Sequence, residues 1–263
     1  MQGAAPLWLP KNCMCTIAFL IDVVDGARLV VGANRDELFA RPARPPEVLR
    51  ESPRVVGGVD ELSGGTWLAL RRDGHFAAVT NQRALATVPA GLRSRGLAVK
   101  ELAAAIDAEA YVDAMNPVDY ASMNLAWGSA AEVTIAYLRR ELDAIEVEHL
   151  EPGIHILAND RIGADGFPRA ERLRDALRAG PLRWPEVADV LATHLADHTR
   201  VAPPPSHLPD EIARELTATC IHAPHYGTRC STIFAVNDDG VVGYRHADGP
   251  PCVTPYRDRM ELL

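Results

Sequence analysis

The chain has 263 residues, 48% hydrophobic and 24% charged; these are the proportions of an ordinary globular protein and exclude a disordered one. Its formal net charge of −8 and its lack of a basic tract argue against nucleic acid or an anionic membrane surface as a partner. No apolar run reaches the length of a membrane-spanning helix, about 18 residues. The five cysteines, an odd number, favour reduced thiols and therefore a cytoplasmic location.

The first fourteen residues contain two prolines and only a short apolar patch, so they make a poor signal peptide. We expect residues 1–14 to form a leader that is disordered or absent from the mature chain, and residues 15–263 to form a single domain. The pair Met14-Cys15 is notable, because removal of an initiator methionine at Met14 leaves Cys15 as the amino terminus. A retained leader blocks any chemistry that needs this free amine.

A hairpin is predicted next, with strands at residues 16–22 and 29–32 joined at Asp25-Gly26. Asp-Gly between two apolar runs is a strong hairpin signal, since the tight turn needs residues that tolerate positive φ. The return strand is followed by four polar residues, Asn34-Arg35-Asp36-Glu37, which the hairpin brings back beside Cys15.

The rest of the chain predicts groups of strands and groups of helices. Residues 39–53 are rich in proline and are expected to cross the surface without joining a central strand. Glycine pairs at 57–58 and 64–65 are expected to bracket a loop. A second hairpin is predicted at 66–70 and 75–80, helices at 94–106 and 108–115, strands at 123–127, 133–138, 145–150 and 154–158, helices at 167–177, 184–198 and 210–216, and a third hairpin at 228–236 and 241–245. This grouping indicates an α+β fold.

Cys15 is the strongest catalytic candidate. A cysteine at the start of a strand is most often a small buried residue. An N-terminal cysteine, however, carries its own base, because an α-amino group has a pKa near 8 and lies beside the thiol. Arg35 and Asp36 are either a surface ion pair or groups that line a cleft, with Arg35 favouring the thiolate or holding a substrate carboxylate. Residues 34 and 36 share one strand face and residue 35 the other, so Arg35 and Asp36 meet one site only if the backbone turns.

Two asparagines also end predicted strands. Asn81 and Asn159 are turn residues in the simpler interpretation. In the functional interpretation their amides donate to the oxyanion that develops on a carbonyl oxygen.

We expect no metal site, although several histidines lie at spacings or beside residues that metal sites use. His194 and His198 have helical spacing but lack the glutamate of an HExxH motif, and no paired CxxC motif is present. Cys220, His222 and His225 offer ligand types, yet solvated histidines are the commoner outcome. Cys230, inside a predicted strand, is expected to pack in the core.

In several short motifs the chain resembles the NRDE family, also called the transport and Golgi organisation protein 2 family. These motifs are Cys15-Thr16, the block at 34–37, GGTWLAL at 64–70, TNQR at 80–83 and YGTR at 226–229. That family is similar to the N-terminal nucleophile (Ntn) hydrolases, so the resemblance implies a four-layer αββα sandwich with two antiparallel sheets between helix layers.

The choloylglycine hydrolase and penicillin V acylase branch of that group has the most similar pattern. The resemblance implies that Cys15 is the nucleophile, Asp36 the partner of its amino group, Asn159 an oxyanion donor and Arg229 a late arginine near the thiol. The branch has an arginine where this chain has Ala33, and here Arg35 follows instead. Further contacts to the substrate are expected from Asn34, Glu37 and Trp67.

Two main functions stay open at this point, beside the weaker alternative of a structural or trafficking scaffold. The first is a hydrolase that cleaves the amide bond of a small molecule through an acyl-enzyme on Cys15, with no cofactor. The second is a non-catalytic binding or trafficking protein on the same fold, whose ligand is haem or an acylated lipid.

Overall fold

The structure, a computed structural model, describes residues 15–82, 88–130, 132–179, 183–193 and 209–263. The expected leader, residues 1–14, lies outside this part of the chain. Within it, no helix is long and apolar enough to cross a membrane.

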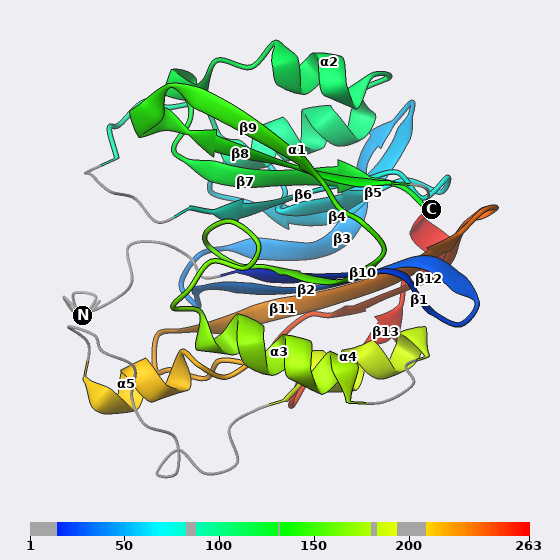
Figure 1. Cartoon of the computed structure of the whole chain (residues 1–263), viewed down its shortest axis with the longest axis vertical. Helices are drawn as coiled ribbons and strands as arrows, with labels where there is room; N and C mark the ends of the chain where they lie inside the picture. Colours follow the sequence, from blue (N-terminus) through cyan, green and yellow to red (C-terminus); the bar gives the residue numbers. More distant parts are fainter. Residues whose placement is uncertain (1–14, 83–87, 131, 180–182, 194–208) are drawn as a thin grey trace.

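Two antiparallel sheets pack face to face between helices (Figure 1). In order across it, the six-stranded sheet contains β10 (Gly153–Leu157), β1 (Thr16–Val24), β2 (Ala27–Leu38), β11 (Tyr226–Asn237), β12 (Gly240–Ala247) and β13 (Arg257–Asp258). The seven-stranded sheet contains β3 (Ala43–Glu51), β4 (Arg54–Asp60), β5 (Leu68–Leu70), β6 (Phe76–Asn81), β7 (Met123–Gly128), β8 (Val133–Arg139) and β9 (Ala144–His149).

Helices cover the outer face of each sheet. The helices α1 (Arg95–Ala104) and α2 (Ala108–Asp113) lie over the seven-stranded sheet, and α3 (Pro168–Arg178) and α4 (Val187–Leu191) lie over the six-stranded one (Figure 1). A short helix, α5 (Asp210–Glu215), precedes β11. The predicted αββα sandwich is confirmed.

The layers explain why the central strands are apolar on both faces. Alternate residues of β1 enter the core between the sheets, where Phe19 packs beside Phe76, or the core beneath α3 and α4, where Leu20 packs. A strand covered on both sides reads as a continuous apolar run. The hairpin joining β1 to β2 turns at Gly26, whose φ of +76° suits glycine.

Four local predictions are wrong in whole or in part. The block 34–37 lies within β2 and not after it. Residues 39–53 contain β3, which forms the edge of the seven-stranded sheet, where proline costs no ladder hydrogen bond. Gly57 and Gly58 lie inside β4. Helix α4 ends at Leu191, and His194 onward lies outside the described residues.

Candidate active site

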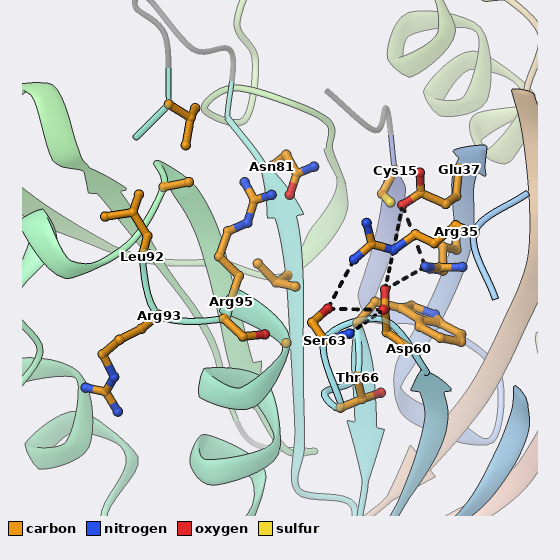
Figure 2. A pocket seen from close by; sticks show the side chains of 17 residues that line it. Cys15, Arg35, Glu37, Asp60, Ser63, Thr66, Asn81, Leu92, Arg93 and Arg95 are labelled. Atoms are coloured by element: carbon orange, nitrogen blue, oxygen red, sulfur yellow. Dashed lines mark hydrogen bonds and ion pairs between the residues drawn. The ribbon is translucent and has the colours of Figure 1, made fainter. Parts of the chain in front are cut away.

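A cavity of about 300 Å³ opens at the end of the sandwich where Cys15 immediately precedes β1. It is lined from the six-stranded sheet by Cys15, Arg35 and Glu37, and from the other side by Trp67, Asn81 and the segment that starts α1. Figure 2 shows Asn81 facing Cys15 and Glu37 across the cavity. The structure therefore brings together five of the nine residues expected at the site.

The Cys15 thiol is held at the mouth of this cavity. Its Sγ lies 3.9 Å from the main-chain oxygen of Asp36, and the residue is partly exposed. Burial of the sulfur, and then the negative charge of Asp36, raise the pKa of the Cys15 thiol to about 11, although the positive charge of Arg35 opposes the shift. At neutral pH the thiol is protonated, so it needs a base before it can act as a nucleophile.

Arg35 offers a donor to a ligand. Its buried guanidinium donates to Asp60 at 3.0 Å, pairs with Glu37 at 3.7 Å and lies 4.6 Å from the centre of the Trp67 ring. Its Nη1 is buried and has no hydrogen-bond partner among the described residues. Because an unsatisfied buried donor costs about 1–3 kcal/mol, this atom favours the arrival of a ligand oxygen.

Asp60, at the end of β4, fixes the arginines of the cavity and was missed from the sequence. Its carboxylate also accepts from Arg41 at 2.6 Å and from the hydroxyl and amide of Ser63, each at 3.1 Å. Burial alone raises the pKa of Asp60, but the hydrogen bond and charge of Arg41 and the charge of Arg35 outweigh it and hold the pKa below its ordinary value. The available sequence signal was the position of Asp60, the first polar residue after the apolar run 55–59 and directly before a loop.

The other half of the polar block in β2 faces the helices. The Asn34 side chain donates to the main-chain oxygens of Leu191 at 3.0 Å and Thr219 at 2.9 Å. Since β2 continues without a turn through this block, Arg35 and Glu37 point into the cavity and Asn34 points away from it. The prediction that Asn34 contacts the substrate is therefore not supported by its position.

Asp36 shares the face of Asn34. One of its carboxylate oxygens pairs with Arg169 of α3, and the other accepts from the Thr228 hydroxyl at 2.7 Å. Burial raises the pKa of this carboxyl above its ordinary value, although Arg169 and Thr228 oppose the shift. Arg35 and Asp36 thus do not meet in one site, and Asp36 acts on Cys15 through its charge and its main-chain oxygen.

Asn159 does not line the cavity but contacts a residue that does. Its amide nitrogen donates to the main-chain oxygen of Asn81 at 2.7 Å, and the neighbouring Thr80 hydroxyl donates to the oxygen of Ala158 at 2.6 Å. These bonds join β6 to the end of β10, which belong to different sheets. Asn159 therefore positions Asn81, which lines the cavity itself.

Arg229 occupies a bulge in β11. The pairing of β11 with β2 shifts between Thr228 and Cys230, so Arg229 has no partner residue in the ladder. It is not among the described residues that line the cavity. Cys230, which pairs with Arg35, is buried as predicted.

The sequence model of the family described as Transport and Golgi organisation 2 matches residues 14–246. The chain belongs to that family. It is 28% identical to the Transport and Golgi organization protein 2 homolog of Bos taurus, over 88% of this chain and 91% of the relative. The human homolog is also 28% identical, with the same coverage.

Two solved structures share the fold of this chain. The Caenorhabditis elegans ortholog of N-acylethanolamine-hydrolyzing acid amidase superposes with a TM-score of 0.55 at 13% identity, covering 86% of this chain and 94% of its own. A mutant conjugated bile acid hydrolase from Clostridium perfringens superposes with a TM-score of 0.53 at 12% identity, covering 94% and 93%. At such identities the likeness shows that this chain has their fold.

Proposed function

We propose that this protein is an Ntn-type hydrolase that cleaves a C–N amide bond with Cys15 as its nucleophile. The observation that carries the proposal is the cavity that Cys15, Arg35 and Asn81 line together from two sheets. The two structural neighbours, one named an amidase and the other a hydrolase, support the same general chemistry.

The reaction begins with a proton transfer. In a chain that starts at Cys15, the α-amino group, whose pKa is near 8, takes the thiol proton. The thiolate attacks the amide carbonyl, and the oxyanion accepts hydrogen bonds from Arg35 Nη1 and the Asn81 amide. The C–N bond then breaks as the ammonium returns a proton to the leaving amine. Water hydrolyses the resulting thioester, which releases a carboxylic acid and restores the thiol.

The charges of the cavity favour a substrate with an anionic or oxygen-rich group. Four arginines and two carboxylates line it, although the chain as a whole carries a net charge of −8. One of the four, Arg93, points away from the cavity and pairs with Glu101 (Figure 2). Arg95, by contrast, lies on the Asn81 side of the cavity. A positively charged cleft raises the local concentration of anions.

The first test is the intact mass of the untagged protein made from its native gene. A chain that begins at Cys15 supports the proposal, whereas a chain that retains residues 1–14 has no amine at Cys15 and contradicts it. On the processed chain, a panel of N-acyl amides should be cleaved and should leave an acyl group on Cys15, detected by mass spectrometry. Cys15→Ala should abolish both signals, while Cys230→Ala, a buried thiol that does not line the cavity, should preserve them.

The competing proposal is a non-catalytic protein that binds haem or an acylated lipid at the same place. Among the described residues that line the cavity Cys15 is the one thiol and no histidine is present, so Cys15 is the haem-iron ligand that these residues offer. Saturable haem binding with a Soret shift that Cys15→Ala removes, without acyl-enzyme formation, would replace the hydrolase proposal with this one.

We also propose that the reaction takes place in the cytosol. The support is chemical, because Cys15, Cys220, Cys230 and Cys252 are free thiols and a reducing compartment keeps them so. Localisation of the full chain carrying a small epitope tag tests this expectation, and secretion into the medium would contradict it.

A further inference from the structure

Three soft ligand groups converge on the opposite side of the six-stranded sheet from the cavity. The Sγ of Cys220, the imidazole nitrogen of His222 and the Sγ of Cys252 all lie within 4.8 Å of one another. The imidazole Nε2 and the Cys252 Sγ are 2.9 Å apart, although the two residues are separated by 30 positions in the chain. We propose that these three side chains form a Zn²⁺ site.

The backbone holds the first two ligands in place. Residues 220–222 follow the turn after α5, and His222 forms an isolated β-bridge with Gly227. The Cys220 amide donates to the Thr193 oxygen at 2.9 Å, and the His222 amide donates to the buried carboxylate of Glu215. Glu215 thereby positions His222 from outside the ligand set.

The third ligand comes from the turn after β12. Cys252 follows two prolines, and the amides of Val253 and Thr254 both donate to the Pro250 oxygen, at 3.1 and 2.9 Å. These bonds close the turn and carry the Cys252 thiol towards His222. The site is therefore assembled by tertiary structure from two segments that the sequence keeps apart.

The donor set and its dimensions fit zinc. Two thiolates and one imidazole are the ligand types of Zn²⁺, and Ca²⁺ and Mg²⁺ prefer oxygen. Zn–S bonds of about 2.3 Å and Zn–N bonds of about 2.0 Å in a tetrahedron place donors about 3.5–3.8 Å apart, which small side-chain adjustments reach here. Both thiols lose their protons to solvent as the metal binds. Because Cys220 is buried and His222 is exposed, the fourth position faces water.

Hydrogen bonds link the site to the polar block of β2, residues 34–37. The Ile221 amide donates to the Thr228 hydroxyl at 2.9 Å, and that hydroxyl donates to Asp36 at 2.7 Å. The Thr219 oxygen accepts from Asn34. A metal that fixes residues 220–222 therefore also fixes the groups that hold Asn34 and Asp36. This role is structural and does not depend on whether Cys15 is catalytic.

The test is the zinc content of the full chain after dialysis against metal-free buffer, measured by inductively coupled plasma mass spectrometry. We expect zinc equimolar with protein, and Co²⁺ exchanged into the site should give thiolate-to-cobalt charge-transfer bands and the visible bands of a tetrahedral centre. Loss of an outer-shell partner weakens metal affinity by about 10- to 100-fold. His222→Ala and Cys252→Ser should each weaken zinc binding by more than that, because each removes a ligand. The matched control is His225→Ala, an exposed histidine of the same segment that does not belong to the cluster.

Because the His222 side chain is exposed, its replacement leaves no cavity in the core, and a circular dichroism spectrum that matches the parent's distinguishes loss of zinc from loss of fold. The work is done in a Cys13→Ser background, which removes a thiol outside the described residues. Equal zinc in His222→Ala and in the parent protein would overturn the proposal. So would a parent protein without zinc whose intact mass shows a Cys220–Cys252 disulfide.

Discussion

The protonation of Cys15 decides how the proposed chemistry can begin, and it can be measured without a substrate. In the chain that carries residues before Cys15, burial and the charge of Asp36 raise the thiol pKa from 9.0 to about 11. The thiolate fraction at pH 7 is then about 10⁻⁴ in the folded protein, against about 10⁻² in the unfolded chain. Since the thiolate is the species that reacts, alkylation of folded Cys15 should be about 100-fold slower.

The assay is alkylation by iodoacetamide from pH 7 to pH 10.5, followed on the Cys15 peptide by mass spectrometry, with the same chain in urea as reference. The folded protein should show a rate that still rises steeply at pH 10, whereas the rate of the unfolded chain should be half-maximal near pH 9 and level off near pH 10. Arg35→Met should slow the reaction further, because the charge of Arg35 lowers the Cys15 pKa. Arg93→Met, whose guanidinium points away from the cavity, is the matched control.

A folded chain whose alkylation rate levels off near pH 10, as that of the unfolded chain does, would refute this account of the site's electrostatics. The chain that begins at Cys15 supplies a further comparison. Its α-amino group can accept the thiol proton, so alkylation at pH 7 should be faster than in the longer chain. Equal rates in the two chains would show that the amine does not serve as the base.

Three further perturbations test how the site is supported. Asp36→Asn should lower the free energy of unfolding by roughly 3–5 kcal/mol in urea titrations, because it leaves Arg169 buried without a carboxylate; full stability with lost activity would instead place Asp36 in the chemistry. Burial lowers the pKa of His246 from 6.5 to about 3, so below pH 6.5 the unfolded chain binds a proton that the folded protein does not. The free energy of unfolding should therefore fall by about 2 kcal/mol between pH 7 and pH 5. His246→Gln should remove that fall, and parallel pH profiles of the two proteins would contradict this. Gly58→Ala places a Cβ 2.1 Å from the Trp67 ring and should cost about 1–3 kcal/mol. An equal cost in a Trp67→Leu background would refute that contact as the cause.

Much of the fold could be predicted because its signals are local. Asp25-Gly26 marked a hairpin, and Ser94 preceded a helix whose first turn it caps by accepting from the Leu97 amide. Where a local signal was ambiguous the prediction was wrong. The prolines before residue 47 argued against a strand, but they are compatible with the edge of a sheet, and which strand forms an edge is not a local property.

The candidate site could likewise be predicted only where its signals are local. The residues of β2 were recognisable as a functional block, and their alternation implied that Arg35 and Asp36 face opposite sides. The sequence could not reveal that Asp60 and Trp67 meet Arg35, because those contacts cross from one sheet to the other. Nor could it show that Cys252 reaches His222, since a contact between separated segments is set by how the layers close.

By itself, then, the sequence determined the periodicities: which stretches form strands, which faces of them are apolar, and where a thiol and polar side chains stand along them. Only the tertiary structure decided which face of β2 looks into the cavity and which lies against α3 and α4. The physical reason is that alternation along a strand determines which residues share a face. Whether that face lines the cavity or packs against helices depends on contacts between elements far apart in the chain.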